Sequence, residues 1–362
     1  SFPGAERPAV APLDLTMTAG EITVLIGPSG CGKTTTLRMI NRLVNPTDGV
    51  ITIDGTDIRE QSVTDLRRSI GYVIQQIGLF PHRTIAQNIA TVPKLLGWDK
   101  GRTTKRVAEL AELVGIDPTM LKRYPAELSG GQQQRVGVAR ALAADPPVLL
   151  MDEPFGAVDP IVRAHLQGEL LALQARVHKT IVLVTHDIDE AVLLGDRVAV
   201  LNVGGILEQV AAPDDLLAHP ANEFVGSFVG NERGIKRLSL ATVSELALEP
   251  GPVVDRSASV DEVRTALTRS GLDWLGVTER GQLQGWLPAD AVEAALARAD
   301  GIAPLADAAL EPVVARLQPT SSLRAALEVI LTARSSTALV ADADGTYLGS
   351  VTLETIRSGL AS

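Results

Sequence analysis

Aromatic residues, cysteine and long hydrophobic runs are all scarce in this sequence. Phe, Trp and Tyr together make up 3% of its 362 residues, so an aliphatic core is expected. The one cysteine, Cys31, cannot form an internal disulfide, which fits a reducing, cytosolic setting. No apolar run approaches the roughly 20 residues that a membrane-spanning helix needs. The N-terminus also lacks the pattern of a signal peptide, so we expect any membrane role to depend on a partner.

An excess of basic residues is also absent. The formal net charge is −10 and the isoelectric point is near 5.1, which disfavours nucleic acid as a partner because its binders normally carry a basic face. The content of 45% hydrophobic and 21% charged residues is typical of a well-buried globular protein. The length predicts two or three domains.

A phosphate-binding loop is the first clear motif. The run EITVLIG leads into GPSGCGKT, residues 27–34, and then into a helical pattern, which is the context that this motif requires. Its glycines let the backbone wrap around phosphate oxygens, Lys33 reaches the β- and γ-phosphates, and the hydroxyl of Thr34 suits Mg²⁺. Cys31 is interpreted as a small filler, with a reactive thiol as the alternative. The predicted nucleotide contacts are Gly27, Pro28, Ser29, Gly30, Cys31, Gly32, Lys33, Thr34 and Thr35.

Polar side chains follow the ends of three further apolar runs. In VLLMDEP, Asp152 is expected to hold Mg²⁺ and Glu153 to polarise the attacking water. His186, after TIVLVT, is predicted to stabilise charge near the γ-phosphate, although a histidine at a strand end is more often structural. Gln75 in IGYVIQQ is predicted to reach the metal and the water, and Gln76 competes for that role. The predicted catalytic residues are Lys33, Gln75, Glu153 and His186, and the predicted metal ligands are Thr34, Gln75 and Asp152.

The order of the elements predicts an α/β fold for the first 230 residues or so. PVLLMD and TIVLVTH are near-continuous apolar runs, as in buried parallel strands. NPTDGVITIDGTDI alternates like a β-hairpin, and residues 84–127 are predicted to be largely helical, with breaks at Pro93, Gly97 and Pro118. LSGGQ, residues 128–132, then places two glycines ahead of another helix, which suits an anion. The sequence thus predicts a second anion site.

Five of these motifs, in this order, resemble the nucleotide-binding subunit of an ATP-binding cassette (ABC) transporter. They are GPSGCGKT, the glutamine of YVIQ, LSGGQ, LLMDEP with the following AVD, and the histidine of VTHD. The resemblance implies a P-loop NTPase domain over residues 1–232, with a RecA-like core and a helical subdomain at about 77–145. It also implies hydrolysis of ATP with Mg²⁺ as cofactor.

The same resemblance gives the second anion site an occupant. In this family two subunits face each other head to tail, so LSGGQ would bind the ATP of a second copy. Ser129 and Gly131 would contact the γ-phosphate held by the opposite Lys33, and Asp159 of AVD would lie at the dimer interface. The implied contacts across the interface are Ser129, Gly130, Gly131, Gln132 and Asp159.

Further partners are implied by the family alone. Phe2 matches the aromatic residue that stacks on adenine. LFPH and TIAQNIATVPKLLGWDK would form a groove for a cytoplasmic helix of an integral membrane permease, although their apolar residues could equally be ordinary core. The chain would then be peripheral, at the cytoplasmic face of the inner membrane. An extracytoplasmic solute-binding protein would be an indirect partner.

After NERGIKRL, two segments of the chain resemble each other. SVDEVRTALTRSGLDWLGV, 259–277, aligns without a gap with SLRAALEVILTARSSTALV, 322–340, and LEP precedes both, at 248–250 and 310–312. We interpret this as an internal duplication, with a coincidental aliphatic likeness as the alternative. The pair resembles a tandem cystathionine-β-synthase (CBS) α+β module, with a linker and module 1 at 233–300 and module 2 at 301–362.

The tail departs from the pattern of CBS pairs that bind adenosine. In the second module Gly349 and Thr352 match, but Thr355 stands where an acidic residue is expected. In the first module, Pro288 and Ala291 replace both the hydroxyl and the acidic residue. The usual ribose contact is therefore not expected, and we predict an electrostatic, salt-responsive role or a purely structural one.

The cargo is suggested by FGAVDP, IGYVIQQIGLFPH and the duplicated tail, which together resemble importers of quaternary amines such as glycine betaine, choline, carnitine and proline betaine. A separate binding protein would select the cargo, so Trp274 and Trp286 are interpreted as packing residues and not as a cation cage. Three alternatives remain: an importer of another small solute, a cassette ATPase that moves no solute, and a nucleotide-sensing regulator. The last is opposed by the four intact residues Lys33, Asp152, Glu153 and His186.

Overall fold

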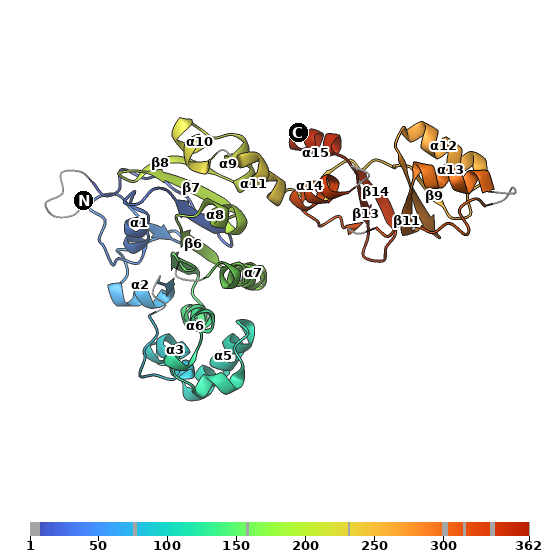
Figure 1. Cartoon of the computed structure of the whole chain (residues 1–362). Coiled ribbons are helices and arrows are strands. Elements are labelled where there is room, and N and C mark those ends of the chain that lie inside the picture. The colour runs from blue at the N-terminus through green and yellow to red at the C-terminus, as the bar shows by residue number, and fades with distance from the viewer. Residues whose placement is uncertain are drawn as a thin grey trace. The chain divides into compact units, whose positions relative to one another are not determined.

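The computed structural model describes residues 8–74, 78–156, 159–230, 232–298, 303–313, 316–333 and 337–361. The chain divides into two compact units, Ser1–Asn231 and Glu232–Ser362 (Figure 1). Within the described ranges, no helix is both long and apolar enough to cross a membrane.

A six-stranded sheet forms the centre of the first unit, in the order β4-β5-β6-β1-β7-β8. Neighbouring strands run parallel, except that β8 is antiparallel to β7. The central strands β1, β5 and β6 are buried along nearly their whole length, which confirms the prediction made from their continuous apolar runs. The strands are β1 (Ile22–Ile26), β4 (Ile70–Val73), β5 (Val148–Asp152), β6 (Thr180–Val184), β7 (Arg197–Asn202) and β8 (Ile206–Ala211).

Helices pack on this sheet and form a separate helical region between β4 and β5. Helix α1 packs on β5 and β6, and α8 packs on β1. The core beneath α1 is aliphatic, with Leu25, Leu37 and Leu150 fully buried together. The helices are α1 (Lys33–Ile40), α2 (Val63–Ser69), α3 (Ile85–Ile89), α4 (Thr91–Leu95), α5 (Lys100–Leu113), α6 (Gly130–Leu142), α7 (Pro160–Val177), α8 (Ile188–Leu194), α9 (Pro213–Ala218) and α10 (Glu223–Val229), with 3₁₀ turns η1 (Pro118–Lys122) and η2 (Pro125–Glu127).

The break predicted at Pro93 is wrong. Pro93 lies in the first turn of α4, and the chain turns instead at Ala90, which ends α3 and begins α4. A proline is tolerated in a first turn because its absent N–H would have no intrahelical partner there. The break at Gly97 is confirmed, since α4 ends at Leu95 and Gly97, just beyond its C-cap residue, has a φ of +74°.

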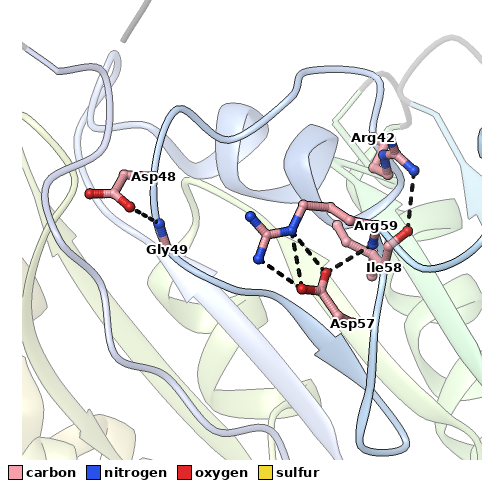
Figure 2. Close-up of polar contacts among 6 residues, drawn as sticks. All are labelled: Arg42, Asp48, Gly49, Asp57, Ile58 and Arg59. Atoms are coloured by element: carbon pink, nitrogen blue, oxygen red, sulfur yellow. Dashed lines mark hydrogen bonds and ion pairs between the residues drawn. The ribbon is translucent and has the colours of Figure 1, made fainter.

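The predicted hairpin is present but short, with β2 (Thr52–Ile53) antiparallel to β3 (Thr56–Asp57). Asp57 accepts hydrogen bonds from the Arg59 guanidinium, and this contact lowers the pKa of the Asp57 carboxyl (Figure 2). Arg42 has a φ of +52° just beyond the end of α1, and its Nη1 donates to the Ile58 carbonyl oxygen at 3.3 Å. The turn after α1 is thereby tied to the hairpin.

The second unit contains two three-stranded sheets with the same order of elements: strand, helix, strand, strand, helix. In each, the middle strand pairs parallel with the first and antiparallel with the last. The antiparallel register shifts directly after Val277 in one sheet and after the aligned Val340 in the other. Shared topology and a shared irregularity support the interpretation as a duplication. The elements are β9 (Val253–Asp255), α12 (Val260–Ser270), β10 (Trp274–Glu279), β11 (Gln282–Pro288) and α13 (Ala289–Arg298), then β12 (Arg316–Leu317), α14 (Leu323–Thr332), β13 (Ala338–Ala341), β14 (Tyr347–Val351) and α15 (Leu353–Ala361), preceded by α11 (Arg233–Leu240) and η3 (Val243–Glu245).

The two LEP segments hold the modules together reciprocally. Glu249, ahead of the first module, exchanges backbone hydrogen bonds of 3.1 and 2.7 Å with Ser350 of β14. Glu311, ahead of the second module, exchanges bonds of 2.9 and 3.0 Å with Trp286 of β11. Trp274 is 1% exposed and packs with Leu283 and Leu339, so the interpretation of Trp274 as a packing residue is confirmed.

Candidate functional site

The site lies where three neighbouring parallel strands end. Because β5, β6 and β1 are adjacent and parallel, their carboxyl ends meet at one edge of the sheet. The hydrogen-bond ladder continues past the strands: Glu153 N–H donates to the Val184 carbonyl at 2.9 Å, and Thr185 N–H donates to the Leu25 carbonyl at 3.2 Å. The segments that follow all three strands are therefore fixed relative to one another.

Glycines allow the loop after β1 to pass close to other backbone. Gly27 has a φ of +150°, and a Cβ there would lie 2.1 Å from the Leu201 carbonyl oxygen. Gly32 has a φ of +101° and immediately precedes α1, where a Cβ would lie 2.7 Å from the Ala9 carbonyl oxygen. Ser29 and Gly30 are exposed at the tip of the loop. The loop thus ends at the N-terminus of α1, with its tip open to a ligand.

Lys33 lies inside the loop that it is predicted to serve. Its side chain is buried, and Nζ donates to the carbonyl oxygens of Gly27 at 2.7 Å and Pro28 at 3.1 Å. Cys31 is fully buried in the core beneath α1, with its sulfur 3.6 Å from Lys33 Nζ. Its burial agrees with the interpretation of the side chain as a small filler.

Two predicted metal ligands contact each other across the site. Thr34 Oγ1 donates to Asp152 Oδ1 at 3.0 Å, which joins the start of α1 to the end of β5. Burial raises the pKa of the Asp152 carboxyl, and the hydrogen bond from Thr34 partly opposes this. A partly desolvated carboxylate beside a hydroxyl is an oxygen donor set suited to Mg²⁺, which binds through few protein ligands and keeps its waters.

The backbone at Glu153 is strained. Its φ of +44° lies in the left-handed region, which is unfavourable for a residue with a side chain, and such strain gathers at functional sites. Glu153 Oε2 lies 3.4 Å from His186 Nδ1, and the His186 side chain remains 63% exposed. The structure thus brings the predicted general base and the strand-end histidine together beside Asp152.

The LSGGQ segment forms the start of α6. Ser129 is the N-cap, its Oγ accepts from Gln132 N–H at 3.3 Å, and Gln132 Oε1 accepts from Ser129 N–H at 3.0 Å. This capping box leaves the glycine N–H groups of a 13-residue helix at an exposed terminus. No residue of α6 belongs to the strand ends around Lys33.

Asp159 caps another helix. Its Oδ1 accepts from Val162 N–H at 3.1 Å at the start of α7, and the residue is exposed. The predicted roles of Gln75, with its competitor Gln76, and of Phe2 fall outside the described residues.

Two positioning residues were not predicted. Asn88 in α3 is fully buried. Its side-chain amide accepts a hydrogen bond from Phe80 N–H at 2.8 Å and donates one to the Arg83 carbonyl at 3.1 Å, so Asn88 fixes the LFPH segment. The available indication in the sequence was a polar residue between the buried Ile85 and Ile89.

Arg38 was the second residue not predicted. It hydrogen-bonds Tyr72, and its positive charge lowers the pKa of the Asp152 carboxyl. Nothing in the sequence around Arg38 indicated this, because the contact joins separate elements.

In the tail, Thr355, which stands where adenosine-binding CBS pairs carry an acidic residue, is hydrogen-bonded within the chain itself. Thr355 Oγ1 lies 2.8 Å from Thr352 Oγ1 and donates to Glu249 Oε1 at 3.2 Å. The carboxylate comes from the first LEP segment, 106 residues earlier.

Comparisons with known proteins agree with this geometry. Residues 10–156 match the family model described as "ABC transporter". The osmoprotectant import ATP-binding protein OsmV of Salmonella typhimurium is 56% identical over 257 residues, covering 71% of this chain and 67% of that protein. The glycine betaine/carnitine/choline transport ATP-binding protein OpuCA of Bacillus subtilis is 50% identical over 289 residues, covering 79% and 76%.

Solved structures give the same assignment. The dimeric bacterial ABC transporter cassette MJ0796 is 35% identical and covers 57% of this chain and 90% of that one, with a TM-score of 0.50. CbiO1 of Clostridium perfringens is 27% identical and covers 64% and 88%, with a TM-score of 0.56. The predicted resemblance and P-loop fold are confirmed. The phosphate loop and the strand-end carboxylates agree with these matches, and by its likeness to the named import proteins the chain belongs to the ATP-binding subunits, the ATPases, of ABC transporters.

Proposed function

We propose that this chain powers the import of a quaternary-amine osmoprotectant through a separate membrane permease. The extent of the alignments supports this cargo. The match to OpuCA spans 289 residues, more than the 231 residues of the first unit, so it includes part of the tail. The sulfate/thiosulfate import protein CysA of Nocardia farcinica is 51% identical over only 213 residues, a length that the first unit alone can supply.

The proposed reaction is hydrolysis of the ATP γ-phosphate at the edge formed by β1, β5 and β6. Lys33 would bind the β- and γ-phosphates together with the loop N–H groups. Thr34 and Asp152 would hold Mg²⁺, which neutralises phosphate charge when bound. Glu153 would orient and deprotonate the attacking water, and His186, beside Glu153, would stabilise charge developing on the γ-phosphate.

A second copy of the chain would complete the site. The ends of β1, β5 and β6 would supply groups on one side of the γ-phosphate. The exposed N-terminus of α6 offers further N–H groups, which take no part in the strand-end site of the same chain. Placing that terminus over the ATP of a partner, head to tail, adds a positive helix end to the charge cage. ATP would then hold the dimer together, and hydrolysis would release it.

The permease would dock on the helical region. Large apolar side chains are exposed at Phe80, Leu95 and Leu96, in and beside the segments predicted to form the groove. Asn88 fixes the backbone around Phe80, so that this side chain is held at the surface. Docking there would place the chain at the cytoplasmic face of the membrane, with the solute-binding protein on the other side.

For the tail, a CBS pair with a structural or salt-responsive role is proposed, over the residues 233–362. The hydrogen bond from Thr355 to the Glu249 carboxylate supports it, because it engages within the chain the position at which adenosine-binding pairs carry an acidic residue. Exposed charges would report ionic strength because the screening length falls from about 10 Å at 0.1 M salt to about 3 Å at 1 M.

Uptake measurements test the cargo. In cells whose transporter depends on this chain, radiolabelled glycine betaine, choline and carnitine are supplied separately, with sulfate as the comparison solute. Uptake of at least one amine, lost with Lys33→Ala, is expected. Lys33-dependent uptake of sulfate with none of the amines would contradict the cargo and favour the importer of another solute.

A further inference from the structure

Glu190, a residue that the proposed reaction does not use, is buried in the first unit. It belongs to α8, which begins just after the segment that carries His186, and it is 6% exposed. A glutamate is almost never buried unless its carboxyl has partners, because leaving water disfavours the charged form. Burial accordingly raises the pKa of this carboxyl, and hydrogen bonds from Thr185 and Gln167 lower it. An aliphatic side chain would fill the same space without the desolvation of a carboxyl, so packing alone does not explain a glutamate here.

The Glu190 carboxyl joins α7 to the segment that follows β6. From α7, Gln167 Nε2 donates to Glu190 Oε1 at 3.1 Å, and Gln167 is itself 7% exposed. From the end of β6, the Thr185 hydroxyl donates to the same carboxyl, and Thr185 is 2% exposed. Nearer the surface, Arg163 of α7 forms an ion pair with Asp187 at 3.6 Å. Helix α7 is thus joined at two points to the segment after β6.

The Thr185 hydroxyl sets the backbone around His186. Its Oγ1 accepts a hydrogen bond from Asp187 N–H at 3.1 Å, and this bond spans His186. A hydroxyl rotates freely, and it accepts from Asp187 only while its own O–H points elsewhere. The Glu190 carboxyl is the acceptor that holds the O–H in that direction. Because the His186 side chain is 63% exposed, its neighbours restrain it little, and the backbone decides its place 3.4 Å from Glu153 Oε2.

We propose that Glu190 is a positioning residue for ATP hydrolysis. Its carboxyl orients the Thr185 hydroxyl, the hydroxyl fixes the turn that carries His186, and His186 is thereby held beside Glu153. Gln167 extends this chain of hydrogen bonds to α7. The inference rests on the proposed role of His186. It concerns kcat and not the KM for ATP, because the described hydrogen-bond partners of Glu190 lie on α7 and after β6 and not on the phosphate loop.

Steady-state ATPase kinetics of the full-length protein test the carboxyl. Glu190→Leu removes both hydrogen bonds and is expected to lower kcat by about tenfold or more, since misplacing a reacting group by about 1 Å can cost about 10²-fold. The KM for ATP should not change. Glu190→Gln should restore most of kcat, because its amide oxygen accepts from Thr185 once the Gln167 amide rotates to accept from the new NH₂ group. Wild-type kcat in Glu190→Leu, or an equal loss in Glu190→Gln, would overturn the proposal.

Gln174 provides a matched control on α7. It is 8% exposed, and its amide donates to the carbonyls of Gly20 at 2.8 Å and Lys179 at 2.7 Å, just before the amino ends of β1 and β6. Gln167→Leu and Gln174→Leu therefore each remove buried hydrogen bonds from one helix, at opposite edges of the sheet. Thermal unfolding measures the stability that each variant loses, but only Gln167→Leu should lower kcat. An equal fall of kcat in both variants would trace the effect to stability and overturn the proposal.

A double substitution shows whether Glu190 acts through His186. His186→Ala should lower kcat by itself, and adding Glu190→Leu should lower it no further, whereas independent effects would multiply. A further loss in the double variant would overturn the proposal. Wild-type kcat in His186→Ala would refute the role of His186 and, with it, that of Glu190. A loss in His186→Ala with none in Glu190→Leu would refute the role of Glu190 alone. If Glu190→Leu does not fold, Thr185→Val, which removes the hydroxyl at nearly the same size, takes its place.

Discussion

The first unit and the tail both place glycines where other backbone passes closely, but the two regions surround them with different neighbours. In the first unit, Gly27 and Gly32 shape a loop whose tip stays open, and Lys33 and Asp152 stand beside it. In the tail, Gly285 and Gly349 lie against the chain's own LEP segments. Glycine therefore leaves room for a ligand in the first unit and for the chain's own backbone in the tail. The residues around each glycine determine which of the two it serves.

The largest expected effect comes from the general base. Glu153→Gln keeps the size of the side chain but removes its ability to take a proton, so ATPase activity should fall by about 10²–10⁴-fold. ATP should still bind and hold the dimer. Glu279→Gln, at the exposed end of β10 in the tail, is the matched control and should change neither. Phosphate release and gel filtration with ATP measure both, and full hydrolysis by Glu153→Gln would refute the assigned base.

The next test compares two capping boxes. Ser129 caps α6 with Gln132, and Ser259 caps α12 with Glu262, so Ser→Ala should cost each helix about 1 kcal/mol. Only Ser129→Ala should also lose a γ-phosphate contact, and by analogy with a lost oxyanion donor its ATPase rate should fall by about 10²–10³-fold. If both variants hydrolyse ATP at the same rate, Ser129 is a cap and nothing more.

A smaller effect is expected at the packing glycines of the tail. A Cβ at Gly349 would lie 2.7 Å from Leu248 Cβ, and one at Gly285 would lie 2.7 Å from the Glu311 carbonyl oxygen. Gly349→Ala and Gly285→Ala should each destabilise the tail by about 1–3 kcal/mol through overpacking, with ATPase unchanged. Gly234→Ala, which meets no atom within 4 Å, is the control. Calorimetric unfolding that is identical in all three would show that the LEP contacts carry no stability.

The smallest expected effect is a difference in pH dependence between two carboxyls. Burial raises the pKa of Glu190 above 4.5, whereas hydrogen bonds from Ser259 lower the pKa of Glu262 below 4.5. The stability from Glu190 is complete below the unfolded pKa and is lost as pH rises through the folded pKa. That from Glu262 is present above the unfolded pKa and is lost as pH falls through the folded pKa.

Glu190→Gln should therefore gain stability relative to the wild type as pH rises above about 4.5. Glu262→Gln should lose stability relative to the wild type as pH rises toward about 4.5 from below, and this difference should stay constant at higher pH. Denaturant unfolding at a series of pH values measures both trends, and parallel trends in the two variants would contradict the opposite signs.

Local sequence was sufficient wherever neighbouring residues decide the outcome. The continuous apolar runs predicted β5 and β6, the glycine spacing predicted the phosphate loop, and the aligned segments of the tail predicted two modules with one topology. The helix break predicted at Pro93 was wrong because proline breaks a helix only when it lies in the interior, whereas the first turn accommodates it. Local composition does not indicate which of these positions a proline occupies.

The sequence by itself determined the nucleotide chemistry, because that chemistry needs particular side chains at fixed spacing on a strand, a loop and a helix. Only the tertiary structure decided which distant groups meet: His186 beside Glu153, Asp152 beside Thr34, and Glu249 on Thr355. Those contacts arise from strand order and from the reciprocal LEP segments. Strand order and pairing are set by the packing of the whole core, which no short motif contains.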